Sequence, residues 1–257
     1  MRRPFVLVAA PSTLVVAVLV GGCQNSQPAD SEPQSVAHTT GSTPQSVTTT
    51  AISLTPVAGK YAAAFGNDVG SSADGSTWNV RTPRVDGGEA TVRDAFNDEF
   101  TKHVDALVAS SDGPKLTLTD GELNPMEKTQ TVVGASTLSG VMIVSAFSDG
   151  AAHPNTDLAT VVVDSSNGRQ LTLDSVLKEP SAGRSSLLNL AAAYDTSGRL
   201  KDAHPTADEP GRWIALPDGL HLYVPVSHAM GDYVPVTIPW HDVEPLLTSS
   251  ARHLLVT

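Results

Sequence analysis

Three kinds of side chain in this sequence could support chemistry: a single cysteine, Cys23, eight histidines and many serines. A hydrolase needs a nucleophile, a base that activates it and an acid that orients the base. The sequence has no Gly-x-Ser-x-Gly motif, and Ser175, three residues before Lys178, lacks the Ser-Asp-Asn and Lys-Thr-Gly partners of penicillin-binding enzymes. We therefore expect a non-enzymatic protein with no catalytic residues, although scattered serines and histidines could still meet in the fold.

The histidines and carboxylates do not have the spacing of a metal site. The nearest set follows no recognised ligand pattern: His153, Asp157, His204, Asp208, His221, His228, His241 and Asp242. We expect no metal and no cofactor. His153 lies in a turn that begins at Gly150, where a hydrogen bond that holds the loop is the plainer interpretation and a ligand contact is the alternative.

The segment 225–234 lies between two expected strands and is the second place where contact residues could be displayed. Rigid scaffolds often present binding residues on such loops. The alternative is that Met230 and Tyr233 only cover the edge of a sheet. Four residues of the two loops are our candidates for ligand binding: His153, Asn155, His228 and Tyr233.

Residues 1–22 have the features of a cleavable signal peptide. Arg2 and Arg3 precede an apolar stretch that Pro11 interrupts, and the uninterrupted run 14–20 is much shorter than the roughly 20 residues that cross a bilayer. The sequence Val-Gly-Gly-Cys at 20–23 resembles the lipobox of bacterial lipoproteins. A plain secretory cleavage site beside a cysteine is the alternative.

We expect the thiol of Cys23 to receive a diacylglycerol before cleavage makes it the new N-terminus. Lipidation accounts for a lone cysteine in an exported chain, which would otherwise be an unpaired thiol in an oxidising compartment. Residues 23–50 are rich in Ser, Thr, Gln and Pro, so we expect a disordered tether. The resulting protein would be lipid-anchored at the cell membrane and would face outward.

The charge of the chain argues against nucleic acid as a partner. Loss of residues 1–22 removes two arginines and no acidic residue, which changes the formal net charge from −11 to −13. Such an acidic body is repelled by nucleic acid and by anionic lipid headgroups.

One amphipathic helix and a series of strands are expected in the folded body. Between Thr82 and Asp112, apolar residues recur every three to four positions, with His103 near the edge of the stripe: Val92, Phe96, Phe100, Val104, Leu107 and Val108. Strands are expected at 76–81, 115–119, 129–136, 140–147, 157–164, 212–216, 220–224 and 234–238. Because the strands cluster, the expected class is α+β, with an antiparallel sheet and helices packed on one side.

The smaller elements give further local predictions. We expect Pro83 to limit the strand at 76–81 and Asp174 to cap a short helix. Gly219 should supply a positive φ in a hairpin. Helices are expected over 185–194 and from Pro239 through Leu247, and a loop over 195–211.

The C-terminal half contains an ordered set of motifs: GAAHPN at 150–155, SNGRQLTLDSVL at 166–177, WIALPDGLHLYV at 213–224, GDY at 231–233 and VTIPW at 236–240. This order resembles the C-terminal domain of unknown function shared by the anti-sigma factor RsiV and the peptidoglycan deacetylase PdaC, which also occurs in a secreted actinobacterial immunogenic protein. The helix at 90–110, which bears Asn97, is similar to the companion N-terminal region of that family.

The resemblance implies a compact α+β unit in which helices pack on one side of an antiparallel sheet. It also implies a recognition element, because the sequence lacks the deacetylase domain of PdaC and the sigma-binding segment and membrane span of RsiV. We divide the chain into a signal peptide (1–22), a tether (23–50), an N-terminal α+β part (51–139) and the C-terminal domain (140–257).

The function predicted from the sequence is recognition of a cell-wall polymer, such as peptidoglycan, or of an extracellular protein. Two alternatives remain at this point. One is a wall-modifying hydrolase with a dispersed site, and the other is a carrier of an apolar ligand.

Overall fold

The computed structural model describes residues 60–110, 115–124, 127–203 and 212–256. The predicted signal peptide, Cys23 and the tether lie outside the described residues, as do His204 and Asp208. All described residues belong to one compact unit, Ser53–Thr257. Among them, no helix has both the length and the apolar character that a membrane span requires.

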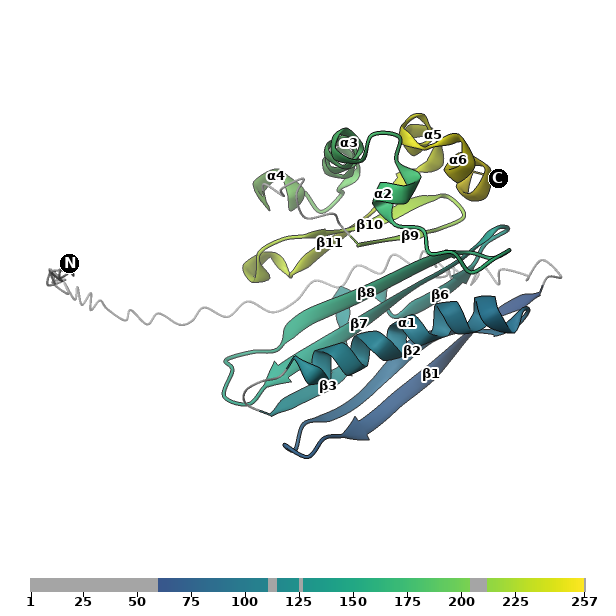
Figure 1. Cartoon of the computed structure of the whole chain (residues 1–257). Coiled ribbons are helices and arrows are strands. Elements are labelled where there is room, and N and C mark those ends of the chain that lie inside the picture. Colours follow the sequence, from purple (N-terminus) through teal and green to yellow (C-terminus); the bar gives the residue numbers. More distant parts are fainter. Residues whose placement is uncertain (1–59, 111–114, 125–126, 204–211, 257) are drawn as a thin grey trace, which may run out of the picture. The chain divides into compact units, whose positions relative to one another are not determined.

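A six-stranded sheet forms the centre of this unit (Figure 1). Its strands are β1 (Tyr61–Ser71), β2 (Thr77–Gly87), β3 (Leu116–Asp120), β6 (Gln130–Val133), β7 (Thr137–Ser148) and β8 (Asn155–Asp164). The order is β1-β2-β3-β7-β6, and β8 pairs with β7 at the outer edge. The pair β2–β3 is parallel, whereas the other pairs are antiparallel.

Strand β2 continues through Pro83 to Gly87, so the prediction that Pro83 limits the strand is wrong. The alternating backbone explains why the proline is tolerated. The N–H groups of Arg81 and Val85 point away from β1, toward the carboxylate of Asp120 and the side chain of Asn97. Pro83 shares that direction, so its missing N–H removes no bond to β1.

Helix α1 (Ala90–Ala109) covers one face of this sheet and confirms the predicted apolar stripe. Val92, Phe96, Phe100 and Val104 are all buried against residues of the large sheet such as Leu138. The helix follows two glycines with positive φ, Gly87 and Gly88, which reverse the chain after β2.

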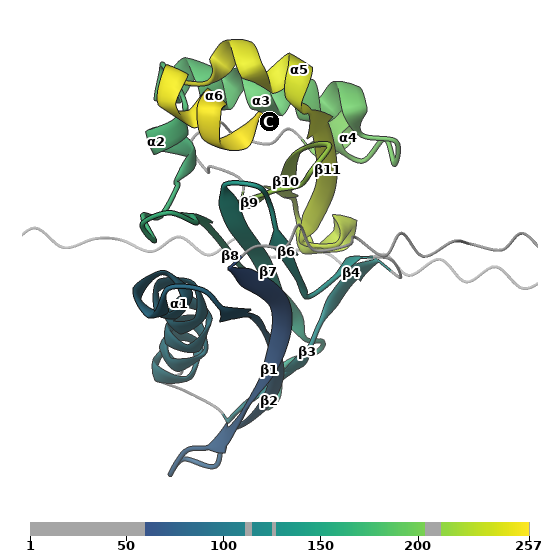
Figure 2. The ribbon, with the colours of Figure 1, turned by 90° about the vertical axis from the view of Figure 1, so that its right-hand side faces the viewer.

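A second, three-stranded antiparallel sheet packs on the other face of the large sheet (Figure 2). It contains β9 (Arg212–Ala215), β10 (Gly219–Pro225) and β11 (Tyr233–Pro239). Val141 and Ile143 of β7 contact Ile214 and Tyr223 of this sheet, and Leu158 of β8 joins them. The α+β class is therefore confirmed, with most of the described strands divided between these two sheets.

The remaining helices pack on the small sheet, on the side away from the large one (Figure 2). They are α2 (Leu173–Val176), α3 (Pro180–Tyr194), α4 (Leu200–Ala203), α5 (Trp240–Val243) and α6 (Ser249–Leu255), with 3-10 turns η1 (His228–Met230) and η2 (Glu244–Leu246). A two-stranded ribbon joins β4 (Glu122–Asn124) to β5 (Glu127–Lys128).

Three local predictions are wrong. Thr172, not Asp174, caps α2, because its side chain reaches the N–H of Ser175 from the position before the helix. Gly219 is not among the glycines with positive φ; it is needed for space, since a Cβ there would lie 2.2 Å from the carbonyl oxygen of Ile238. The expected loop at 195–211 contains helix α4, and residues 204–211 lie outside the described part.

The boundary that we placed between residues 139 and 140 falls inside β7. Strand β7 pairs with β3 and β6, which lie in the predicted N-terminal part, and with β8, which lies in the predicted C-terminal domain.

Candidate functional site

Two loops from distant parts of the sequence come together at one end of β8 and carry the predicted ligand-binding histidines. The first precedes β8 and contains His153, and the second joins β10 to β11 and contains His228. The two imidazole rings are stacked, with centroids 3.9 Å apart and planes 5° from parallel. The structure thus places side by side two residues that are 75 positions apart in the numbering.

Asp232 holds the second loop against β8. One oxygen of its carboxylate, Oδ2, accepts a hydrogen bond from the N–H of Thr156 at 3.0 Å, and the other, Oδ1, lies 2.9 Å from Nδ1 of His228. Asp232 has a φ of 64°, which aspartate tolerates better than most residues. The N–H of Val226 donates to the carbonyl of Asp232 and closes the loop.

A second contact fixes the other side of this loop. Nη1 of Arg199, just before α4, donates to the carbonyl oxygen of Met230 at 2.9 Å. His228 nevertheless remains accessible, with 47% of its side chain exposed, and His153 is exposed as well. The β10–β11 loop therefore displays His228 on a backbone that is fixed from both sides, and His153 of the other loop stacks on it.

The other two candidates have different surroundings. Tyr233 is half-buried and packs against the cluster of Ile143 and Leu158 between the two sheets. Asn155 is the exposed first residue of β8, and among the described residues its side chain has no hydrogen-bond partner. The structure brings the two histidines together but gives Tyr233 a role in packing.

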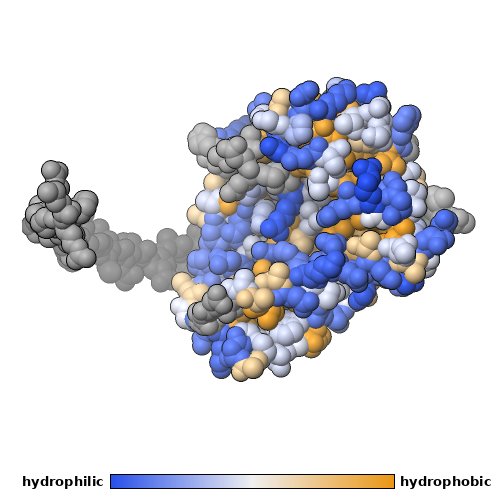
Figure 3. Space-filling view, viewed as in Figure 1, coloured by the Kyte–Doolittle hydropathy of each residue, from blue (hydrophilic) through white to orange (hydrophobic). Residues whose placement is uncertain are grey.

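A cleft of about 230 Å³ lies on the outer side of β8, and Figure 1 shows the two elements that flank it, α1 and β9. Its lining residues come from α1, β8, the segment after β8, and β9: Glu99, His103, Ala159, Thr160, Val161, Gln170 and Arg212. Figure 3 shows the same side of the molecule, where hydrophilic residues are interspersed with smaller hydrophobic groups. This cleft was not predicted from the sequence.

An acid–base pair lies beside this cleft. Nε2 of His103 is 2.5 Å from Oδ1 of Asp157, and Nη1 of Arg212 is 3.8 Å from the same oxygen. Burial raises the pKa of Asp157, but the hydrogen bond and charge of His103, together with Arg212, outweigh burial and hold the pKa below its ordinary value. The carboxylate is therefore charged at neutral pH.

A third polar group is buried between the small sheet and the β4–β5 ribbon. The hydroxyl of Tyr223 donates to Oε1 of Glu127 at 2.8 Å, and Nε2 of His221 lies 3.5 Å from the same oxygen. Nδ1 of His221 lies 2.7 Å from Oγ1 of Thr237. Burial raises the pKa of Tyr223, and the charge of Glu127 adds to the shift, so the hydroxyl stays protonated and donates.

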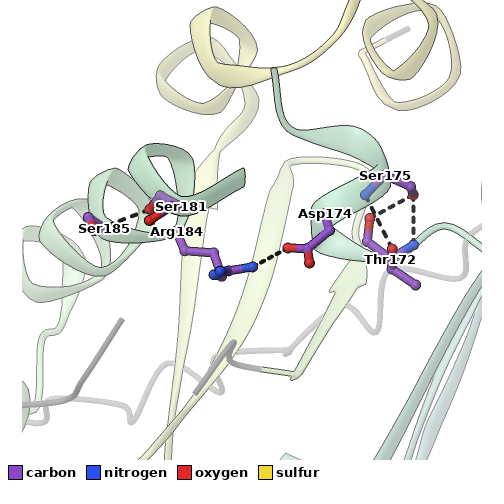
Figure 4. Close-up of polar contacts among 6 residues, drawn as sticks. All are labelled: Thr172, Asp174, Ser175, Ser181, Arg184 and Ser185. Carbon is purple, nitrogen blue, oxygen red and sulfur yellow. Dashed lines mark hydrogen bonds and ion pairs between the residues drawn. The ribbon is translucent and has the colours of Figure 1, made fainter. Parts of the chain in front are cut away.

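Ser175, which lies three residues before Lys178, has a structural role (Figure 4). Its backbone N–H donates to Oγ1 of Thr172, and its hydroxyl completes a capping box with the backbone of Thr172. Asp174 forms an ion pair with Arg184 of α3. Lys178 points elsewhere and donates to the carbonyl of Pro245.

Among the described residues, no group of three or more His, Cys, Asp or Glu side chains has the arrangement of a metal site. His241 pairs with Asp242 at 3.5 Å, away from the stacked histidines.

Comparison with known proteins supports the fold. No protein-family model matches the chain, and no curated protein matches it. Several solved structures are similar, among them two DUF3298 family proteins. One, from Pseudomonas aeruginosa PAO1, has 9% sequence identity and a TM-score of 0.51 over 74% of this chain and 95% of that chain. The other, from Bacteroides fragilis, has 15% identity and a TM-score of 0.46 over 74% of this chain and 94% of that chain.

The described residues thus share their fold with a DUF3298 family protein. DUF3298 is a domain of unknown function. At this level of identity the similarity concerns the fold and does not carry a function.

Proposed function

We propose that this protein is a lipid-anchored lipoprotein of the cell envelope, and that its folded body is a non-enzymatic recognition module for a cell-wall polymer or an extracellular protein. The stacked pair His153–His228 carries the recognition part of the proposal. The ring of His228 is carried by a loop that two contacts hold in place, so binding there loses little conformational entropy.

The anchoring part rests on the sequence around Cys23. A membrane-held module that follows a tether of 28 residues, 23–50, would sample the space just outside the membrane. Its acidity favours partners that are neutral or basic on their contact surface.

Cell fractionation of a Cys23→Ala variant tests the anchor. The wild-type chain should be found with membranes, whereas the variant should appear in the medium or as an uncleaved precursor. Lipid labelling that persists in Cys23→Ala would show that the lipobox interpretation is wrong.

Retention experiments test recognition. The full chain, solubilised in detergent, is passed over purified peptidoglycan and, separately, over an immobilised extract of envelope proteins. Saturable retention on one of the two supports the proposal and selects the class of partner. Absence of retention on both would contradict it.

One observation favours a second function, a hydrolase. The pair His103–Asp157 lies beside a cleft, and Thr160, whose Oγ1 accepts from the N–H of Trp213 at 3.3 Å, is one of the residues that line it. An enzyme of this kind would release soluble fragments from peptidoglycan, and Asp157→Asn would abolish the release. A recognition module would release none.

The charged lining of this cleft does not suit the apolar ligand of a carrier.

A further inference from the structure

Strand β8 turns its edge, rather than one of its faces, toward the cleft. Three consecutive residues of this strand line it: Ala159, Thr160 and Val161. Because neighbouring side chains of a strand point to opposite faces, three consecutive residues share one cleft only where the backbone edge itself is presented.

The hydrogen bonds around β8 show which backbone groups point outward. The carbonyl of Val162 accepts from the N–H of Leu171 at 2.8 Å, and the N–H of Asp164 donates to the carbonyl of Arg169 at 2.9 Å. Both partners lie on the side of β8 away from β7. Since alternate residues of an antiparallel strand share a direction, Thr160 also points its N–H and C=O outward.

These two groups of Thr160 have no hydrogen-bond partner within the part of the chain that the structure describes. Two other residues that point outward, Thr156 and Val162, each have one group bonded. The N–H of Thr156 is bonded to Asp232, and Val162 is bonded to Leu171. Leu158 is fully buried, whereas Thr160 is partly exposed. Within the described ranges, Thr160 is therefore the partly exposed residue of this edge whose N–H and C=O are both free.

The chemistry of an open strand residue selects its ligand. Its N–H and C=O lie on either side of one Cα and point the same way, so they fit a second extended residue that offers C=O and N–H in return. A single trans amide cannot satisfy both groups, since its own N–H and C=O point in opposite directions. A peptide therefore fits this edge better than the acetamido group of a sugar.

The walls of the cleft suit a polar peptide. Arg212 and Gln170 lie along the edge, and α1 contributes Glu99 and His103. The edge from Thr156 to Val162 contains seven residues, and the six steps between them span about 20 Å at the usual rise of a strand. This length accommodates an extended segment of about three to five residues between the two occupied ends.

We propose that the outer edge of β8 at Thr160 binds a short extended segment of a partner protein by strand addition. This inference rests on the proposed function and narrows it, because it identifies the partner as a polypeptide. The backbone of Thr160 would supply affinity, and Glu99, Gln170 and Arg212 would discriminate among side chains.

The test observes the amide of Thr160 by NMR in the full chain, labelled with ¹⁵N and held in detergent micelles. The probes are pools of N-acetylated, C-amidated tetrapeptides of L-residues. We expect at least one pool to shift the Thr160 amide and to slow its exchange with solvent. An ester analogue of the best peptide, which lacks the N–H facing the Thr160 carbonyl, should bind about fivefold more weakly.

Two variants at this position separate the backbone from the side chain. Thr160→Pro removes the outward N–H and should abolish the peptide effect on neighbouring amides, while Thr160→Val keeps the N–H and should preserve it. The ester analogue removes a backbone hydrogen bond from the peptide instead, so it tests the same pairing in the wild-type protein. The proposal is overturned if no pool shifts Thr160, if the ester binds as well as the amide, or if N-acetylglucosamine oligomers shift Thr160 in place of peptides.

These results also distinguish this inference from the proposed function. Retention on envelope material that is unchanged by Thr160→Pro would overturn strand addition and leave the recognition module standing. Failure of the wild-type chain to be retained on any envelope material would contradict the recognition module itself.

Discussion

Replacement of Asp232 should release the β10–β11 loop from β8. Two variants separate the loss of the carboxylate from the cost of a side chain at positive φ. Asp232→Gly removes the carboxylate but accepts the φ of 64°. Asp232→Ala removes the carboxylate and adds a side chain that is unfavourable at positive φ. In the wild type, the N–H of Thr156 donates to the carboxylate of Asp232 at 3.0 Å. Both variants leave this N–H without its acceptor.

The magnitudes follow from these contacts. A buried donor that loses its acceptor costs about 1–3 kcal/mol, and because the Asp232 side chain is 17% exposed, water should reduce the loss for Asp232→Gly to about 1–2 kcal/mol. The left-handed backbone should cost Asp232→Ala roughly 1 kcal/mol more.

Urea unfolding of the two variants and of the wild type, followed by far-UV circular dichroism, measures these free energies. Equal stability of the glycine and alanine variants would refute the argument from backbone conformation. A glycine variant as stable as the wild type would refute the role of the carboxylate as a clamp.

Three other substitutions test the fold around the sites. Asn97→Ala should destabilise the protein by about 2–4 kcal/mol in urea unfolding, because the backbone N–H and C=O of Val85 both lose their partner. Gly219→Ala should cost about 1–3 kcal/mol in the same assay, since the new Cβ would meet the carbonyl of Ile238 at 2.2 Å. The stability difference between wild type and Asp157→Asn should be largest above about pH 4 and should shrink at lower pH, because a lowered folded-state pKa stabilises the fold only while the carboxylate is charged. Urea unfolding curves at neutral and acidic pH measure this difference. A stability difference that grows as the pH falls would contradict the lowered pKa of Asp157.

Elements with a regular apolar pattern were predictable from the sequence. The spacing of Val92, Phe96, Phe100 and Val104 predicts α1 because one face of a helix must be buried. Strand β1 was missed, since its sequence YAAAFGNDVGS has few β-branched residues. It is a strand because all eleven of its residues pair with β2, which is a tertiary effect that local propensity does not contain.

The candidate site was predictable in part. His153 and His228 were found because each lies in a turn-rich segment between strands, but their stacking depends on β8 and β10 ending side by side. His103 and Asp157 are 54 residues apart, and only the packing of α1 across β8 makes them neighbours. The edge of β8 at Thr160 has no sequence signal, because only the tertiary pairing determines that, among the described strands, β8 pairs on one side alone.

The most direct test of the central claim compares two double variants in the retention experiment. His153→Ala with His228→Ala removes the stacked pair, and His241→Ala with His253→Ala removes two exposed histidines elsewhere. If the stacked pair forms the recognition surface, the first variant should lose saturable retention on envelope material at least tenfold, and the second should bind as the wild type does. Equal retention of the two variants would contradict the claim that this surface is where the protein recognises its partner.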